Sequence, residues 1–555
     1  MAADRPYIQF STKDLGRLAD QTANLAVIAS IMHELTFRNR RNADELFRRL
    51  QSRNDGDADL QSELFGIDEV EVPAPTLARP PQFKPTEEQI AAVDAFKSGN
   101  SLKVTAYAGA GKTSTLKLMA DARPGAGLYL AFNRSIATEA AEDFPQGVEC
   151  RTTHSVAKRY VQGRWGYSNP QLTTAIKTKQ LEAELELKKA KLLEGFSLTG
   201  VQQAHLFLKT VRSFCQSDAE AISAEHVPPS GKLLGLGSDE LLHVKHWVTE
   251  RANSLWQRML DKNDNIPLGH DGYLKLWSLQ KPKLAKDYIL LDEAQDTNPC
   301  VLSVLANQDS QIVYVGDRHQ QIYEWRGAVN AMELMETDRE TFLTKSFRFG
   351  HAIAHPAGDI LKALGETESL TGNEAVFSSV IASGTTRAVL ARTNTMVMSE
   401  VLEALGNGRR PHIVGDLKDL ELKVGSVFDL QNGEPGSHPD FFGFSNWDEV
   451  VAFSESEEGE DLRAFVSLVQ RHGPRALWRA LRETTASEDD ADVILSTAHR
   501  AKGREWASVS IADDFASMQD DAGRIPISEA RLFYVAITRA KEILSVNPLL
   551  LSAYA

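Results

Sequence analysis

Two short segments, far apart in the chain, constrain its fold more than any other feature. The first is residues 106–113, Ala-Tyr-Ala-Gly-Ala-Gly-Lys-Thr, and the second is the apolar run 288–291 with the carboxylates Asp292 and Glu293 directly after it. A glycine-bearing loop between a strand and a helix cradles phosphates through backbone N–H groups. A neighbouring strand that ends in carboxylates completes a magnesium site. The pair predicts a site for nucleotide hydrolysis on a parallel sheet.

The residues of these segments have separate predicted roles. Lys112 would reach the β and γ phosphates, Thr113 would give its hydroxyl to Mg²⁺, and Asp292 would complete the metal shell. Glu293 would polarise the attacking water. Ala106 stands where the pattern GxxxxGK[ST] has its first glycine, and the alternative interpretation is a plain glycine-rich turn with an exposed lysine. The predicted phosphate cradle consists of Gly109, Ala110, Gly111, Lys112, Thr113 and Ser114.

Composition narrows the class of protein. The chain has 555 residues, enough for roughly three to five domains of about 100 to 200 residues each. We find no apolar stretch near the roughly 20 residues of a membrane helix, and no signal pattern at the N-terminus, so no membrane association is expected. Three separated cysteines argue against a disulfide framework or a zinc site, which favours a reducing compartment, cytoplasmic (the nucleoid) or nuclear. A formal charge of −15 argues against general adhesion to nucleic acid but allows a locally basic channel.

Hydrophobic periodicity predicts an α/β fold with two parallel sheets, each covered by helices on both faces, and mostly helical insertions. Residues 166–280 are mostly helix-forming, including a Lys/Glu/Leu-rich run from Thr178 to Leu193. Near the N-terminus, an arginine-rich helix is either a partner-binding or DNA-touching element or a cap with a solvated basic face. The predicted segments are 1–80 (helical extension and Pro-rich linker), 81–165 plus 281–338 (first α/β domain), 166–280 (helical insertion), 339–396 plus 492–555 (second α/β domain) and 397–491 (accessory insertion).

Further segments follow in a fixed order along the chain. Gln89 precedes the phosphate loop and can present its amide to adenine. Gln320 follows the acidic segment and stands close to the aromatic residues Tyr323 and Trp325. Arginines recur in three later stretches, one of which also contains His499. These are Ser346–Arg348, Ser496–Glu505 and Leu532–Ala540.

In this order the segments resemble the motifs of superfamily 1A helicases of the UvrD/Rep/PcrA type, over residues 84–547. More narrowly, the stretches His270–Trp277, His412–Gly415 and Ala512–Phe515 resemble the F-box DNA helicase branch. We see no F-box in residues 1–80, so the ubiquitin-ligase part of that family is not expected. The resemblance implies two RecA-like P-loop domains with ATP and Mg²⁺ between them.

The resemblance also assigns residues to the nucleotide site. Arg348 and Arg539 would stabilise the transition state from the second domain, and Gln320 would sense the γ phosphate. Glu505, with Gly503, would meet the ribose. Surface ion pairing is the alternative for both arginines, and Asp296 is left out as a helix cap. The predicted catalytic set is therefore Lys112, Thr113, Asp292, Glu293, Gln320, Arg348 and Arg539.

Single-stranded DNA would lie across both domains, held at phosphates by hydroxyls and N–H groups and at bases by stacking, which tolerates any sequence. For the aromatic candidates the alternative is core packing, and for His154 it is a structural role. The predicted contacts are Phe132, Asn133, Thr153, His154, Tyr273, Trp277, Tyr323, Trp325, Thr497 and His499.

The expected activity is that of an ATP-dependent motor that moves 3′ to 5′ on single-stranded DNA in repair and recombination. The direction is implied by the resemblance, not by the residues. Because the insertion 397–491 is short, displacement of a DNA-bound recombinase is as plausible as strong unwinding. The alternatives are an RNA-directed motor and an ATP-regulated interaction protein that docks through its N-terminal helix.

Overall fold

The structure is a computed structural model, and it describes residues 84–228, 231–323, 329–456, 459–517 and 525–554. The chain divides into two compact units, Met1–Lys84 and Pro85–Ala555, and the description below concerns the second. The predicted N-terminal helix and Trp325 lie outside the described residues. Within the described part, no helix has the length and apolar character needed to cross a membrane.

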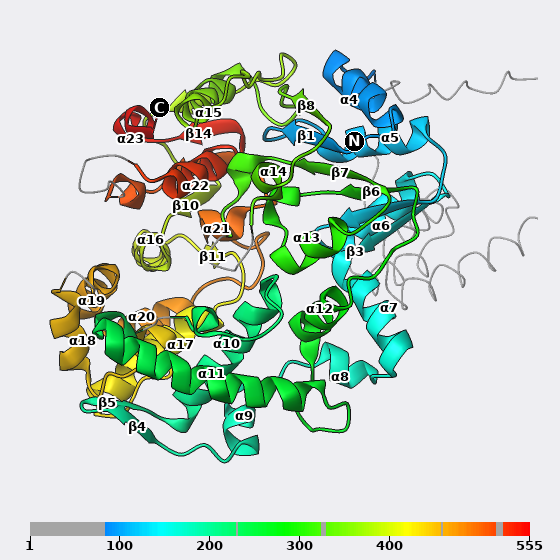
Figure 1. Ribbon diagram of the computed structural model, residues 1–555. Coiled ribbons are helices and arrows are strands. Elements are labelled where there is room, and N and C mark those ends of the chain that lie inside the picture. Colours follow the sequence, from blue (N-terminus) through cyan, green and yellow to red (C-terminus); the bar gives the residue numbers. More distant parts are fainter. Residues whose placement is uncertain (1–83, 229–230, 324–328, 457–458, 518–524, 555) are drawn as a thin grey trace, which may run out of the picture. The chain divides into compact units, whose positions relative to one another are not determined.

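The first sheet has six strands, all paired in parallel, in the order β3-β2-β6-β7-β1-β8 (Figure 1). Helices α4 (Glu87–Lys97), α5 (Lys112–Ala122) and α6 (Arg134–Asp143) share a hydrophobic core with it. A second core joins it to α7 (Thr153–Trp165), α12 (Gly269–Leu279) and α13 (Pro299–Leu305). The strands are β1 (Leu102–Ala106), β2 (Gly127–Ala131), β3 (Val148–Thr152), β6 (Tyr288–Leu291), β7 (Gln311–Gly316) and β8 (Arg339–Leu343).

The second sheet also has six parallel strands, in the order β11-β12-β10-β13-β14-β9. One core contains residues of α15 (His351–Ala363), α22 (Ile527–Ile537) and α23 (Pro548–Tyr554), and the other contains residues of α16 (Asn394–Gly406). Central strands buried on both faces read as continuous apolar runs, which is typical of parallel sheets. The strands are β9 (Ser379–Ile381), β10 (Ala388–Ala391), β11 (Pro411–Ile413), β12 (Val493–Thr497), β13 (Trp506–Ile511) and β14 (Ala540–Ser545).

Two insertions interrupt the sheets. The first contains α8 (Asn169–Thr173), α9 (Thr178–Glu184), α10 (Gly200–Gln216), α11 (Ser238–Leu260) and an antiparallel hairpin of β4 (Ala190–Leu193) and β5 (Phe196–Leu198). The second contains α17 (Lys418–Gln431), α18 (Trp447–Ser454), α19 (Glu460–His472) and α20 (Pro474–Arg482). They touch one another: Lys232 N donates to the carbonyl oxygen of Phe442 at 2.8 Å, and the Phe442 side chain is buried in the core of the first insertion.

The predicted fold class is confirmed, with three corrections. Strand β8 belongs to the first sheet, although the predicted boundary assigned it to the second domain; its polar residues Arg339 and Glu340 are exposed at the sheet edge and hide the strand pattern. The three-residue strand β11 is part of the second sheet, and helix α16 packs against that sheet. Both therefore belong to the second domain rather than to the accessory insertion. The run Thr178–Leu193 is a helix only to Glu184. Glu186, at φ 50°, lies beyond the helix end, and the chain then enters the hairpin.

Candidate active site

The phosphate loop joins β1 to α5, and its two glycines are required by geometry. Gly109 and Gly111 have φ of 76° and 78°, a region that L side chains disfavour. A Cβ at Gly109 would lie 2.6 Å from Ser346 Oγ and 2.7 Å from Arg348 Cβ, so any larger residue would also clash with these neighbours. Ala106, where the usual pattern has its first glycine, is an ordinary residue of β1. The departure from the pattern therefore leaves the phosphate cradle intact.

Lys112 and the two carboxylates meet at the carboxyl end of the sheet. Lys112 Nζ lies 3.2 Å from Glu293 Oε1, while Asp292 accepts a hydrogen bond from Tyr129 Oη at 2.7 Å. Burial and the adjacent Glu293 raise the pKa of Asp292 to about 6. Burial alone would raise the pKa of Glu293, but Lys112 and Lys502 hold it well below its usual range. The site thus has more buried negative charge than its lysine neutralises, which suits a cation.

Thr113 and Asp292 are the predicted metal ligands. Thr113 is exposed in the first turn of α5, directly after Lys112. Within the described residues there is no group of three or more His, Cys, Asp or Glu that could hold a metal. Mg²⁺ commonly takes one or two protein ligands and completes its shell with substrate phosphates and water. A threonine with one carboxylate therefore fits Mg²⁺ that arrives with a nucleotide.

Two arginines from the second domain reach this site. Arg539 is 1% exposed and donates from Nη2 to Gln320 Oε1 at 3.4 Å and to Thr538 Oγ1 at 3.1 Å. Burial and then the nearby Arg348 lower the pKa of Arg539 to about 9, which leaves it charged at neutral pH. Arg348 donates from Nε to Glu505 at 2.7 Å and from Nη1 to the carbonyl oxygen of Thr538 at 3.1 Å. The two predicted arginines are thus brought together with Gln320.

Gln320 is connected to the phosphate loop through a chain of hydrogen bonds. Its Nε2 donates to Asp317 Oδ2 at 2.9 Å. The same oxygen accepts from Tyr534 Oη at 3.0 Å, and Tyr534 Oη in turn accepts from Ala108 N at 3.1 Å. Tyr534, which belongs to α22 of the second domain, therefore bridges two parts of the first. Motif order along the sequence did not single out this residue.

The predicted base and ribose contacts are arranged differently from expectation. Gln89 is fully buried; its Oε1 accepts from Thr86 N and its Nε2 donates to Thr115 Oγ1, both at 3.1 Å. Gln89 thus closes a capping box at the start of α4, and adenine contact needs a new rotamer. Glu505 pairs with Arg348, and Gly503, two residues earlier, is exposed.

Phe347 was not predicted as a site residue from the sequence motifs. Its side chain is 37% exposed, and a Cβ added at Gly111 would lie 3.2 Å from its ring. An exposed aromatic ring beside a phosphate loop offers a stacking surface for a base. Its position directly before Arg348 is a signal that could have found it.

Several predicted DNA contacts lie where strands end and helices begin. Phe132, directly after β2, is 54% exposed, and Asn133 caps α6 by accepting from Ile136 N at 3.0 Å. Thr153 opens α7 after β3. Thr497 caps the short helix α21 (Ala498–Ala501), which contains His499. Helix N-termini present unpaired N–H groups that favour phosphate.

Other predicted contacts are less accessible. Tyr273 and Trp277 are 2% and 1% exposed and lie in the core that joins the first insertion to the sheet, so the packing alternative is favoured for both. His154 lies against Tyr273 with ring centroids 6.0 Å apart, and burial lowers the pKa of His154. Tyr323 Oη donates to the carbonyl oxygen of His499 at 3.1 Å, which links the two domains.

Two further features were missed or set aside. Thr393 lies two residues after β10 of the second sheet and caps α16 by accepting from Met396 N at 3.1 Å, in the same way that Asn133 caps α6. Asp296, set aside as a helix cap, bonds instead to Lys502 of the second domain, whose Nζ also donates to the carbonyl oxygen of Gln320. Burial raises the pKa of Asp296 to about 6, because its effect is larger than the opposing effect of Lys502.

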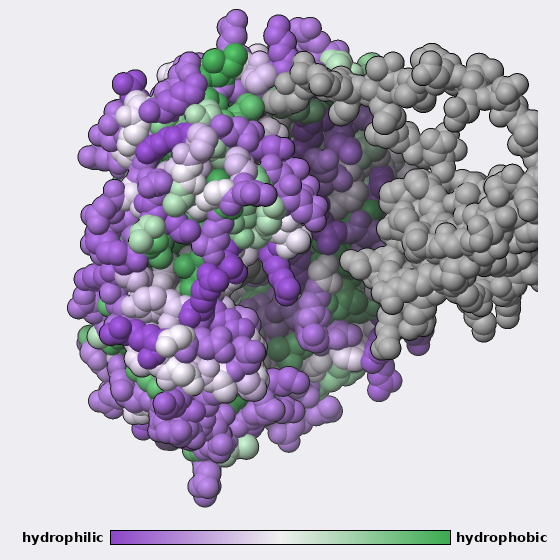
Figure 2. Space-filling model, turned by 90° about the vertical axis from the view of Figure 1, so that its right-hand side faces the viewer, coloured by the Kyte–Doolittle hydropathy of each residue, from purple (hydrophilic) through white to green (hydrophobic). Residues whose placement is uncertain are grey.

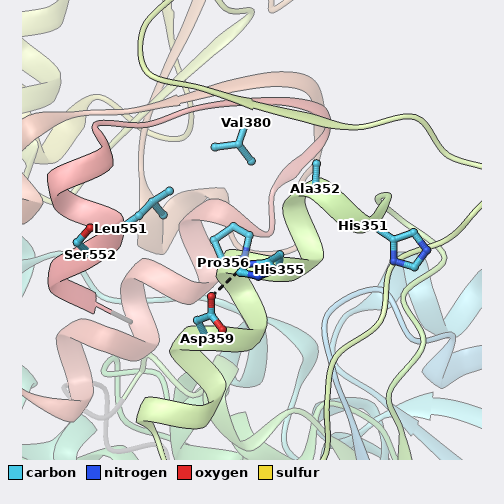
Figure 3. A pocket seen from close by; sticks show the side chains of 8 residues that line it. All are labelled: His351, Ala352, His355, Pro356, Asp359, Val380, Leu551 and Ser552. Carbon is cyan, nitrogen blue, oxygen red and sulfur yellow. Dashed lines mark ion pairs between the residues drawn. The ribbon is translucent and has the colours of Figure 1, made fainter.

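One face of the molecule and one pocket can be described outside this site. Figure 2 shows a mostly hydrophilic face with hydrophobic residues in separate small patches. A pocket of about 610 Å³ lies beside α15, β9 and α23, with His355 paired to Asp359 at 3.0 Å in its wall (Figure 3). None of the predicted site residues lines it, so it is separate from the nucleotide site.

The arrangement defines a class of protein. One domain with a parallel sheet, a phosphate loop and paired carboxylates meets a second parallel-sheet domain that supplies arginines, and this is the arrangement of a P-loop NTPase with two RecA-like domains. Two family models match the chain: the UvrD/REP helicase N-terminal domain over residues 85–341 and the UvrD-like helicase C-terminal domain over residues 447–548. The chain belongs to the family of UvrD-like helicases, which confirms the predicted resemblance.

Known relatives extend this result. F-box DNA helicase 1 of Gallus gallus is 28% identical over 502 residues, which cover 81% of this chain and 48% of the relative. F-box DNA helicase protein 1 of Schizosaccharomyces pombe is 30% identical over 518 residues, 85% of this chain and 58% of the relative. A probable DNA helicase of Mycoplasma pneumoniae is 28% identical over 277 residues, 46% of this chain and 42% of the relative. The chain spans about half the length of the relatives it matches.

Proposed function

We propose that this protein is an ATP-dependent motor that moves along single-stranded DNA from 3′ to 5′. The observation that carries the proposal is the shared nucleotide site. Lys112, Asp292 and Glu293 follow strands of the first sheet, Arg539 directly precedes β14 of the second sheet, and Arg348 lies in the segment that leads from β8 into α15 of the second domain. A site built from two domains couples the state of the nucleotide to the distance between the domains.

Hydrolysis follows from the charges at the site. The phosphate loop and Lys112 would bind the β and γ phosphates, with Thr113 and Asp292 as the protein ligands of Mg²⁺. Bound Mg²⁺ would neutralise charge between those phosphates. Glu293, kept ionised by Lys112, would accept a hydrogen bond from the attacking water. Arg348 and Arg539 would stabilise the charge that spreads over the phosphate in the transition state.

DNA would cross the carboxyl ends of both sheets. Capped helix starts occur there in each domain, at Asn133 in the first and at Thr393 and Thr497 in the second. Phe132 offers an exposed ring for stacking. Contacts of this kind recognise phosphates and base faces rather than base sequence, which suits a motor. Phe347 is our candidate for stacking on the adenine of ATP.

The first test is ATP hydrolysis with and without single-stranded DNA, with RNA of equal mass and a Lys112→Ala variant. Strong stimulation by DNA, weak stimulation by RNA and no hydrolysis by the variant are expected. Hydrolysis that ignores nucleic acid would favour the alternative of an ATP-regulated interaction protein.

Direction needs its own experiment. We expect the protein to displace streptavidin from a biotin at the 5′ end of a single strand faster than from one at the 3′ end. Displacement of a DNA-bound recombinase, compared with unwinding of a duplex, separates the two proposed outcomes of movement. Equal displacement from both ends would contradict the proposed direction.

A further inference from the structure

Glu366 of the second domain is bonded to the loop that carries Gln320 in the first. Arg318 donates to its carboxylate from Nη2 at 2.8 Å and also from Nε, and His319 Nε2 lies 2.6 Å from Oε1. The Glu366 side chain is 1% exposed. Arg318 and His319 stand directly before Gln320 in the short 3-10 helix Arg318–Gln320. One side of this loop thus faces the nucleotide site while its other side chains contact the second domain.

The local structure around Glu366 does not stabilise a buried carboxylate. It follows the end of α15, where its backbone N–H donates to the carbonyl oxygen of Leu361 at 2.9 Å. The C-terminus of a helix carries partial negative charge, which disfavours a carboxylate there. Burial disfavours the charge too, yet His319 and Arg318 hold the pKa of Glu366 near 2. The charge at this position is therefore stabilised across the domain boundary.

The phosphate loop reaches the same place. Tyr107, in the loop, is fully buried, and its Oη donates to the carbonyl oxygen of Glu368 at 3.1 Å. Burial and the nearby Glu366 carboxylate raise the pKa of the Tyr107 hydroxyl. The segment from Glu366 to Glu368 thus contacts two parts of the first domain that would face ATP. The assigned arginines lie elsewhere in this interface, so Glu366 is a separate connection.

We propose that Glu366 is a positioning residue that ties the second motor domain to the loop of Gln320, so that domain closure sets the position of Gln320 for hydrolysis. The inference rests on the proposed function, because it concerns the same ATP site. Without the Glu366 charge, Arg318 loses its buried partner and the loop loses its connection to α15. The phosphate cradle and Lys112 keep their own contacts, so nucleotide binding is retained.

The test compares Glu366→Gln with Glu368→Gln, measured as ATP turnover at saturating single-stranded DNA. Glu368 is a matched control because its side chain is exposed and Tyr107 contacts only its backbone carbonyl. We expect kcat to fall roughly 10- to 100-fold in Glu366→Gln, since small misplacements of catalytic groups cost this much, while KM for ATP stays within about twofold. Glu368→Gln keeps both values. Adding Arg318→Gln to Glu366→Gln lowers kcat no further.

Other outcomes separate the two proposals. A lower melting temperature with unchanged kcat overturns the positioning role, as does equal turnover in the two glutamine variants. If Glu366→Gln does not fold, Arg318→Gln, on the partly exposed side of the same pair, must show the same loss of kcat at constant KM. A wild-type protein whose hydrolysis ignores DNA refutes the proposed function instead.

Discussion

The two six-stranded sheets have the same all-parallel pairing, but they contribute opposite charges to the site between them. Strands of the first sheet end at a phosphate loop and at the carboxylates Asp292 and Glu293. The second domain contributes Arg348 and Arg539. A parallel sheet thus gives helix starts at one edge in both domains, and the side chains there decide what each edge does. We infer that the first domain binds the nucleotide and the second activates it.

Removing the lysine of the first domain should have the largest effect. In Lys112→Ala we expect ATP turnover to fall at least about 1,000-fold, because the charge that holds the β and γ phosphates is lost. Nucleotide binding, measured with a fluorescent ATP analogue, should fall as well. Lys117→Ala on the same helix is the control, since the Lys117 side chain is partly exposed and pairs only loosely with Asp143, 3.8 Å away. Tight nucleotide binding by Lys112→Ala would contradict the inference that the first domain binds the nucleotide and the second activates it.

Arg348 should give a smaller loss from the other side of the cleft. In Arg348→Gln we expect kcat to fall about 100-fold with little change in nucleotide binding, because a cation of the second domain acts on the transition state. Steady-state hydrolysis at saturating DNA measures it. Arg479→Gln, at an exposed position of α20, is the matched control. A rise in KM at constant kcat would mean that Arg348 binds the ground state instead.

The raised pKa of Asp292 in the first domain predicts that the Mg²⁺ requirement for hydrolysis depends on pH. Because the pKa of Asp292 is raised to about 6, its ionised fraction falls about tenfold between pH 7 and pH 5. Mg²⁺ binds the ionised form, so the Mg²⁺ concentration for half-maximal hydrolysis should rise about tenfold as the pH falls over this range. In Tyr129→Phe the hydrogen bond that lowers this pKa is absent, and the change should begin at higher pH. A Mg²⁺ requirement that is constant with pH would contradict the assignment.

Stacking on DNA should show the smallest effect. In Phe132→Ala we expect binding of a single-stranded oligonucleotide to weaken about fivefold, the low end for one base because the ring is half-exposed. Fluorescence anisotropy at fixed salt measures the change. Phe377→Ala, a ring that is 81% exposed in the second domain, is the control and should bind DNA normally. An equal loss of DNA binding in both variants would mean that DNA does not stack on Phe132.

Much of this architecture could be predicted from the sequence. The run at residues 288–291 coincides with β6, because a strand buried on both faces is continuously apolar. The glycines and Lys112 were singled out because phosphate binding demands those residue types at fixed places, whereas Arg348 and Arg539 were assigned through the resemblance to a known family. Edge strands were not found. β8 is polar and β11 has three residues, so neither carries a period-2 signal long enough to detect.

The contacts across the domain boundary could not be predicted. Asp296 resembles a helix cap in sequence, and its partner Lys502 stands about two hundred residues later in the chain. Gln89 has the right residue type for adenine, yet its amide closes a capping box. Trp277 has the right type for stacking and is buried. Residue type suggests a role, but packing against distant segments decides whether the side chain is available.

The most direct test of the shared site is Arg539→Gln, with ATP turnover and binding of a fluorescent ATP analogue measured on the same sample. Turnover about 1,000-fold below wild type, with nucleotide binding within about threefold and DNA binding unchanged, is the result we predict. Near-normal turnover, or loss of nucleotide binding together with turnover, would contradict a site in which the first domain binds ATP and the second activates it.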